Sequence, residues 1–282
     1  MQRQKRSIAW FLLSPLLAGL VVFWGIPGGI LIYRSFFTGA GSDQFIGLQN
    51  YFQVLSSRSF QLACRNTLLF LVVSVPLLLL IGFVFAQVIN RRVSGSRLFQ
   101  SVLLSPLILP AVGIVAMLQI FFADDGLLNL LLAKLNVSGV YWLDSVAAFG
   151  IIVFVFVWKN AGYTTILMMV GLNGIPKELF QIAALDGASR RQILVYVTLP
   201  LMVPTLFFTS LLSIINSFKI YREVLLLAGA HPTPSIYFLQ HYLANNFSSL
   251  DYASVAVATV VFVLAISVFI AAFYRLQQKL EV

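Results

Sequence analysis

Six long apolar segments constrain the fold of this chain more than any other feature. Each is long enough for a helix to cross the hydrocarbon core of a bilayer, which takes about 20 apolar residues at about 1.5 Å per residue. Five contain no charged residue, and the fourth contains only Lys159. The segments comprise residues 8–33, 67–89, 99–123, 146–171, 197–218 and 252–274. The sequence therefore predicts an all-α, polytopic membrane protein with six transmembrane helices in a single domain over residues 1–282.

Composition supports the membrane interpretation. Hydrophobic residues make up 60% of the chain and charged residues only 10%, against roughly 25% charged in ordinary soluble domains. The net charge of +9 does not indicate nucleic-acid binding, because the basic residues are scattered between apolar runs instead of clustering on one surface. The first apolar run is too long for the core of a cleaved signal peptide, so we expect it to be retained as the first span.

Lysine and arginine in the short loops predict the orientation, since cytoplasmic loops carry the excess of these residues. Eleven fall on one side: Arg3, Lys5, Arg6, Arg91, Arg92, Arg97, Lys177, Arg190, Arg191, Arg275 and Lys279. Six fall on the other: Arg34, Arg58, Arg65, Lys134, Lys219 and Arg222. We therefore expect both termini in the cytoplasm.

Motifs for catalysis are absent from the sequence. It contains neither His-Glu-x-x-His nor Gly-x-Ser-x-Gly, and it lacks the Gly-x-x-x-x-Gly-Lys-Ser/Thr phosphate loop. Its single cysteine, Cys64, allows neither an intrachain disulfide nor a cysteine zinc site. No predicted span contains Asp or Glu, which ion-coupled transporters typically use inside the membrane. We expect no enzyme activity, no metal site and no cofactor in this chain.

The loop over residues 172–199 is predicted to be a helix, a turn and a second helix. Pro176 suits a first helical turn, and Asp186-Gly187 is a turn sequence because glycine accepts the positive φ that ends helices. Ser189, followed by Gln192, has the spacing of a capping box. Such short helices are marginal alone. The periodicity leaves two explanations open, a partner protein that binds the loop or an amphipathic loop at the membrane interface.

The same segment resembles the signature loop of permeases in binding-protein-dependent ATP-binding-cassette (ABC) importers. That signature reads Glu-Ala-Ala, three residues, Gly, nine residues, Ile, one residue, Leu-Pro. This chain has Gln181-Ile182-Ala183, Gly187, Val197 and Leu199-Pro200 at those spacings. Further similarity to the carbohydrate-importer branch, and to the first membrane subunit of maltose and glycerol-phosphate importers in particular, covers nearly the whole chain. It is carried by Gly47-Leu48-Gln49-Asn50-Tyr51, Asn66-Thr67-Leu68, Gly126-Leu127-Leu128-Asn129, Trp158-Lys159, Gly171-Leu172, Ile175-Pro176 and Tyr252-Ala253.

The resemblance implies a type I ABC importer permease fold in the bacterial cytoplasmic membrane. It also implies a second, non-identical permease subunit, two ATPase subunits that carry ATP and Mg²⁺, and an extracytoplasmic solute-binding protein that delivers a carbohydrate. Residues 172–199 would then be the coupling loop, which contacts the ATPase. The residues expected to couple are Glu178, Gln181, Ile182, Ala183, Asp186, Gly187, Leu199 and Pro200. Gln181 replaces the family glutamate, so a charged contact at that position becomes a neutral hydrogen bond.

Polar residues inside the fourth and fifth spans are candidates to line a solute pathway. Lys159 and Tyr163 lie one helical turn apart with Asn160 beside Lys159, and Ser213 and Asn216 share a face of the fifth span. An intramembrane charge faces protein or water, so Lys159 either contacts solute or pairs with a partner chain. The serines either line a pathway or let helices pack closely.

Two alternative functions remain open at the level of sequence. A permease of the same superfamily could carry another solute, such as a polyamine or phosphate. From a different class, a channel or membrane scaffold would share the six spans but would not associate with an ATPase.

Overall fold

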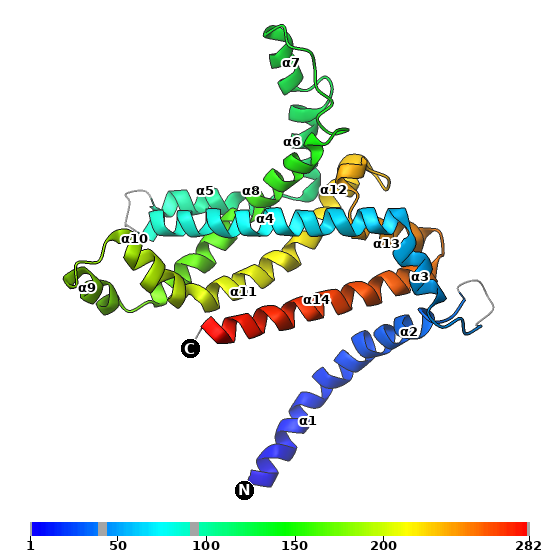
Figure 1. Cartoon of the computed structure of the whole chain (residues 1–282), viewed down its shortest axis with the longest axis horizontal. Coiled ribbons are helices and arrows are strands. Elements are labelled where there is room, and N and C mark those ends of the chain that lie inside the picture. Colours follow the sequence, from blue (N-terminus) through cyan, green and yellow to red (C-terminus); the bar gives the residue numbers. More distant parts are fainter. Residues whose placement is uncertain (1, 39–43, 91–95, 281–282) are drawn as a thin grey trace. The chain divides into compact units, whose positions relative to one another are not determined.

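The computed structural model describes residues 2–38, 44–90 and 96–280, and within them the regular structure is helical. Figure 1 shows long helices joined by short connections, and the described residues include an isolated β-bridge between Phe37 and Phe45. Six helical segments are long and apolar enough to span a membrane. They comprise Leu12–Arg34, Arg58–Asn90, Ala111–Lys134, Ala147–Gly174, Arg190–Ala228 and Tyr252–Arg275. The predicted all-α fold with six apolar spans is confirmed. Arg91 and Arg92, part of the orientation argument, lie outside the described residues.

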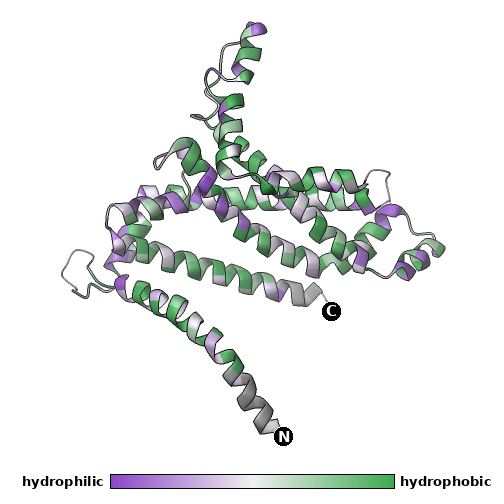
Figure 2. Ribbon diagram, turned by 180° about the vertical axis from the view of Figure 1, so that it is seen from behind, coloured by the Kyte–Doolittle hydropathy of each residue, from purple (hydrophilic) through white to green (hydrophobic). Residues whose placement is uncertain are grey.

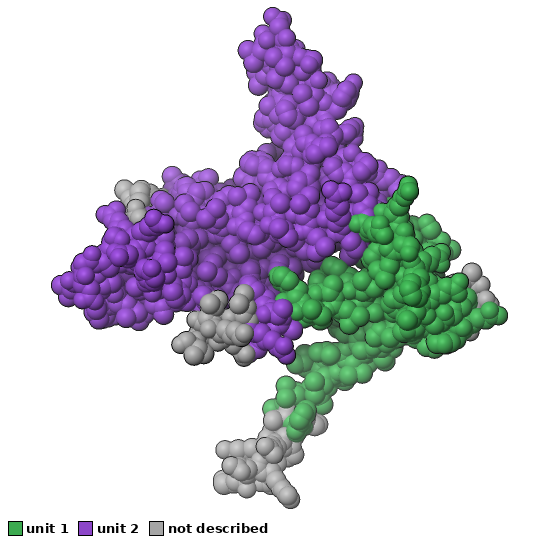
Figure 3. Space-filling model, viewed as in Figure 1, with its two compact units in different colours: residues 1–61, 242–269 green, residues 62–241, 270–282 purple. Residues whose placement is uncertain are grey.

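Two compact units make up the chain (Figure 3). Residues 1–61 and 242–269 form the first unit, and residues 62–241 and 270–282 form the second. Hydrophobic residues predominate along the long helices of both (Figure 2). This surface is what a bilayer, and not water, would solvate.

The first unit begins with one helical run, made of α1 (Gln2–Leu20), a π-helical turn (Val21–Gly25) and α2 (Ile26–Arg34). The short helix α3 (Gln49–Ser56) follows, and Asn50 fixes it by donating to the backbone carbonyls of Ser35 (3.1 Å) and Phe37 (2.9 Å). Helices α13 (Leu239–Ser248) and α14 (Tyr252–Leu280) contribute most of their length to this unit.

The second unit is built around α8 (Ala147–Gly174), most of which is buried. Helices α5 (Ser96–Ile108) and α11 (Leu199–Ser217) pack against it, and the longest helix of the chain, α4 (Arg58–Asn90), lies alongside. The remaining helices of the unit are α6 (Ala111–Phe122), α7 (Leu127–Lys134), α9 (Lys177–Leu185), α10 (Arg190–Ile193) and α12 (Tyr221–Ala228), with 3₁₀ turns at Phe218–Ile220 and Pro234–Ile236.

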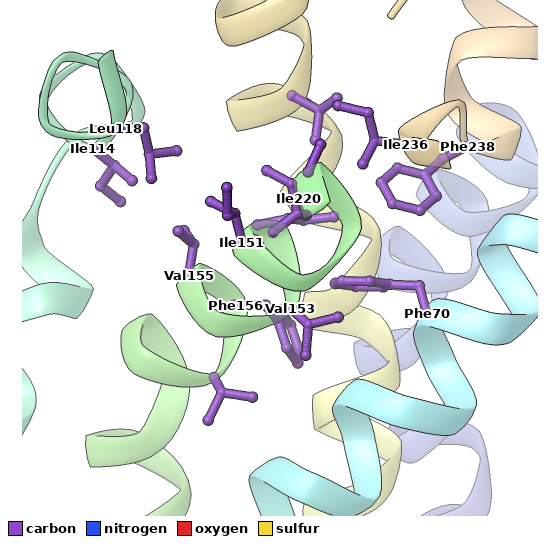
Figure 4. Packing of buried hydrophobic residues seen from close by; sticks show 14 of the residues in the cluster. Phe70, Ile114, Leu118, Ile151, Val153, Val155, Phe156, Ile220, Ile236 and Phe238 are labelled. Atoms are coloured by element: carbon purple, nitrogen blue, oxygen red, sulfur yellow. The ribbon is translucent and has the colours of Figure 1, made fainter. Parts of the chain in front are cut away.

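The core of the second unit lies around the first half of α8 (Figure 4). Phe156 of α8 packs edge-on against Phe70 of α4, with ring centroids 5.4 Å apart. Phe70 also contacts Phe238, at 5.2 Å, in the segment that follows α12. Ile114 of α6 and Ile220 close the cluster from other sides. Four separate parts of the sequence therefore converge on one helix.

The third predicted span, over residues 99–123, is wrong as a single helix. Helix α5 ends at Ile108 and α6 begins at Ala111, with Pro110 in an extended conformation (φ −67°, ψ 150°) between them. Proline cannot donate to the helix ladder and also disfavours helical geometry in the residue before it. In Figure 1 α6 leaves the direction of α5 and continues into α7.

The fifth span also needs correction, because its helix does not begin near Val197. One helical run extends from Arg190 to Ala228, with a π-helical turn (Leu194–Thr198) between α10 and α11. Pro200, near the predicted start of the span, lies inside the run. A π turn also precedes Pro27 in the first unit. Proline has no N–H, so it leaves a backbone carbonyl of the preceding turn without its usual donor. A local π turn rearranges the hydrogen bonds so that such carbonyls find other donors.

Candidate functional site

Helix α9 is the central element of the coupling loop and is exposed along its length. It begins after Pro176, whose backbone has an extended ψ of 130° and so separates α9 from α8. None of its residues is buried. Leu185 is 87% exposed and Ile182 55% exposed. Leu179 is also exposed, so three apolar side chains spaced three residues apart are exposed on this short helix, as at protein interaction surfaces.

Two backbone motifs fix the C-terminal end of α9 and the start of α10. Gly187 has φ +75°, and the N–H groups of Gly187 and Ala188 donate to the carbonyls of Ala184 (3.1 Å) and Ala183 (3.0 Å). This is a Schellman motif, which requires the left-handed conformation that glycine adopts most readily. Ser189 then caps α10, because its hydroxyl accepts from the N–H of Gln192 while the Gln192 side chain accepts from the N–H of Ser189.

The near end of α9 is anchored to the body of the second unit. Ile175 is buried between α8 and α9 and packs in a cluster with Met168 and Leu172 of α8 and Met202 of α11. Phe180 of α9 packs against the same cluster. The loop is therefore held at its base and exposed at its tip.

The predicted coupling residues are placed in two groups. Glu178, Gln181 and Ile182 lie exposed on α9, with Ala183 partly buried, and Asp186 and Gly187 form the turn at its end. Leu199 and Pro200 lie apart from them, inside the helical run that leaves the loop. The predicted coupling residues thus lie partly on an exposed helix and partly within the long helical run that follows it.

The predicted pathway residues lie on α8 and α11, which pack side by side. Lys159 and Tyr163 are half-buried, whereas Asn160 is buried and donates to the carbonyl of Phe156 at 2.8 Å. Tyr163 lies between two contacts that tie α8 to the run carrying α11, namely Gly171 with Thr205 and Lys159 with Glu223.

On α11 the structure separates Ser213 from Asn216. Ser213 is buried, and its hydroxyl donates to the carbonyl of Thr209, in its own helix, at 2.8 Å. Asn216 is half-buried and accepts from the Lys219 ammonium at 2.8 Å. Ser213 therefore has the environment of a residue that lets helices pack, and Asn216 that of a residue at an accessible surface.

Lys159 forms an ion pair with Glu223 of α12, within the same chain. Sequence reasoning did not identify Glu223, because the fifth span was predicted to end before it. The observation that pointed toward it is the isolated charge on Lys159, since an intramembrane lysine commonly pairs with an acidic side chain. Glu223 is 2% exposed and Lys159 22% exposed.

Comparison with known proteins agrees with this architecture. Residues 78–281 match the family model of the binding-protein-dependent transport system inner membrane component. The chain is 30% identical to the trehalose/maltose transport system permease protein MalF of Thermococcus litoralis, over 94% of this chain and 92% of that protein. It is 28% identical to the sn-glycerol-3-phosphate transport system permease protein UgpA of Yersinia pestis, over 92% and 90%.

A solved structure also shares the fold. A chain of the bacterial alginate ABC transporter, in complex with an alginate pentasaccharide-bound periplasmic protein, superposes with a TM-score of 0.83 at 21% identity, over 99% of this chain and 96% of that one. Together with the family match, this likeness establishes that the chain belongs to the binding-protein-dependent transport system inner membrane components and is a multi-pass transport permease.

Proposed function

We propose that this chain forms half of the translocation pathway of an ATP-driven importer for a carbohydrate. A second, non-identical permease would supply the other half, two ATPase subunits would carry ATP and Mg²⁺, and an extracytoplasmic protein would deliver the solute. The functions of the relatives, transport of trehalose and maltose or of sn-glycerol 3-phosphate, support this solute class. The chain itself would carry out no catalytic step.

The observation that carries the proposal is the geometry of α9. Its apolar tip is exposed, its base is anchored by Ile175, and its far end is fixed by the Gly187 turn. A docking helix held in this way transmits a displacement instead of absorbing it, because both its connections are stiff. Closure of an ATPase dimer that holds α9 would move it as a rigid body and switch the access of the pathway.

Substitution at Gly187 tests the coupling role. Gly187→Pro removes the N–H bonded to Ala184 and cannot adopt φ +75°, so α9 should no longer be held at its far end. The chain would be reconstituted in liposomes with its second permease, ATPase and binding protein. We expect ATP hydrolysis stimulated by solute-loaded binding protein to be lost in the variant.

Gly174 and Gly187 provide a matched pair of control substitutions. An added Cβ meets no atom within 4 Å at either position, but only Gly187 has positive φ. Gly187→Ala should therefore cost roughly 1 kcal/mol and weaken stimulation partly, while Gly174→Ala leaves it intact. Hydrolysis that does not respond to this chain or to its loop would contradict the importer proposal and favour a channel or scaffold.

A further inference from the structure

The Lys159–Glu223 ion pair lies at the edge of the core of the second unit. On α8, Phe156 and Val155 near Lys159 are buried, and on α12 Val224, the neighbour of Glu223, is fully buried. Water screens charges poorly in such surroundings. The two charges therefore attract each other more strongly than they would in water.

The two partners are exposed to different degrees. The Glu223 side chain is 2% exposed, whereas the Lys159 side chain is 22% exposed. One carboxylate oxygen, Oε1, accepts from the lysine ammonium, and the other, Oε2, has no hydrogen-bond partner among the described residues. Lys159 is therefore the more accessible group of the pair, and Glu223 is the buried group whose negative charge balances it.

We propose that Glu223 sets the charge selectivity of the solute pathway by neutralising Lys159, so that the pathway accepts uncharged polyhydroxylated solutes in preference to anionic ones. Glu223 acts as a positioning residue through Lys159. The inference rests on the proposed function and on the expectation from the sequence that Lys159 faces the pathway. The functions of the relatives leave the charge of the solute open, because trehalose and maltose are uncharged and sn-glycerol 3-phosphate is an anion.

Hydrogen-bond chemistry gives the selectivity its direction. An ammonium has three donors, and one of them is directed at Glu223. A sugar hydroxyl can accept from a remaining donor without disturbing the pair. A carboxylate or phosphate would instead compete with Glu223 for the same ammonium and would lie close to its negative charge, where like-charge juxtaposition is costly.

Two matched probes test the inference. Methyl glucoside and methyl glucuronide differ by one carboxylate, and their dissociation constants can be measured by saturation-transfer NMR on the permease–ATPase complex in nanodiscs. The solute-binding protein is omitted, so that only the pathway is probed. We expect the wild-type complex to prefer the glucoside by about tenfold or more, and Glu223→Gln to remove or reverse that preference.

Two further variants separate charge from structure. Lys159→Gln with Glu223→Gln removes both charges and should keep the preference for the glucoside, and Glu223→Asp retains the charge and should do the same. A merely structural role for Glu223 would weaken binding of both probes equally. If Glu223→Gln does not fold, Lys159→Gln decides the matter, because it leaves the Glu223 carboxylate without its counter-charge and should raise the preference for the glucoside above the wild-type ratio.

The inference is overturned if the wild-type complex binds neither probe, prefers the glucuronide, or if Glu223→Gln keeps the wild-type ratio. These outcomes differ from failure of the proposed function. Failure of the function appears as ATP hydrolysis that is indifferent to the coupling loop, whereas failure of the inference leaves stimulated hydrolysis intact and changes only the expected ratio.

Discussion

Gly162 allows helix α5 to approach the backbone of α8. A Cβ added at Gly162 would lie 2.1 Å from the carbonyl oxygen of Leu103, which is a backbone atom and cannot rotate away. Close backbone approach at small residues is the usual means of joining helices within a bilayer, where water does not drive apolar surfaces together. Residue 162 must therefore lack a side chain because α5 lies so close to it, and not because its backbone adopts a positive φ.

We expect Gly162→Ala to destabilise the chain by about 1–3 kcal/mol, the usual cost of overpacking. Gly150→Ala on the same helix is the matched control, because a Cβ there meets no atom within 4 Å. Thermal unfolding in nanodiscs, followed by tryptophan fluorescence, would give the two midpoints. Equal midpoints would show that α5 does not pack on α8 as described.

His241 is a fully buried residue outside the apolar spans. Its Nδ1 accepts from the N–H of Phe238 at 3.2 Å, and its ring packs edge-on against Tyr221 with centroids 4.7 Å apart. Burial, with a smaller contribution from the charge of His231, lowers the pKa of His241 from 6.5 to about 4. The neutral form is therefore the one that the fold accommodates.

This pKa predicts a loss of stability in acid. Between about pH 6.5 and pH 4 the unfolded chain binds a proton at His241 that the folded chain does not, so the free energy of unfolding falls as the pH falls through that window. His241→Gln should flatten the dependence of the unfolding midpoint on pH, and His231→Gln should change it little. An unchanged slope in His241→Gln would refute the assignment.

The residue scale also shows where sequence reasoning succeeded and failed. The isolated charge of Lys159 predicted contact with solute or pairing with a partner chain, and the structure pairs it instead with Glu223 of the same chain. Its partner could not be named, because Glu223 is distant in sequence and lies beyond the predicted end of the fifth span. Pairing across helices depends on which helices pack together, and apolar periodicity does not contain that information.

At the scale of elements, the turn in the coupling loop could be predicted because its causes are local. Gly187 and the Ser189–Gln192 pair form the turn and cap that their types and spacing indicate. The breaks and continuities of the helices around prolines were harder to predict. Pro110 separates two helices, whereas Pro200 follows a π turn within one run, and the difference depends on tertiary packing.

Asn129 organises the segment that follows α6. Its side chain donates to the carbonyls of Asp124 and Val140, both at 3.0 Å. Its Oδ1 accepts from the N–H of Val140 and from the indole of Trp142, also at 3.0 Å. A single side chain on α7 thus joins the segment before α7 to the segment that leads from α7 to α8.

Asn129→Ala should loosen this connection without affecting α8 itself. We expect faster amide hydrogen exchange over residues 123–142 and a red shift of the Trp142 emission, because the indole released from Asn129 becomes more exposed to water. Gln119→Ala on α6, an exposed position, is the control and should leave both readouts as in the wild type. Unchanged exchange in Asn129→Ala would mean that α7 is held by other contacts.

At the scale of the whole molecule, the number of spans could be predicted because a bilayer sets the length of each helix. The division into two compact units could not. It depends on contacts between distant parts of the sequence, such as Asn66 of α4 donating to the carbonyls of Pro234 (2.6 Å) and Tyr237 (3.0 Å). Six similar apolar runs do not reveal which of them pack together.

The helical run from Arg190 to Ala228 has a mechanical consequence. It contains 39 residues, so at 1.5 Å per residue it is about 58 Å long. Thr205, near its middle, touches Gly171 of α8, and this contact is a natural fulcrum. If the helical run pivots at this contact, its two ends move in opposite directions. A displacement of its first residues, which follow α9, would then move Glu223 in the opposite direction and strain its ion pair with Lys159.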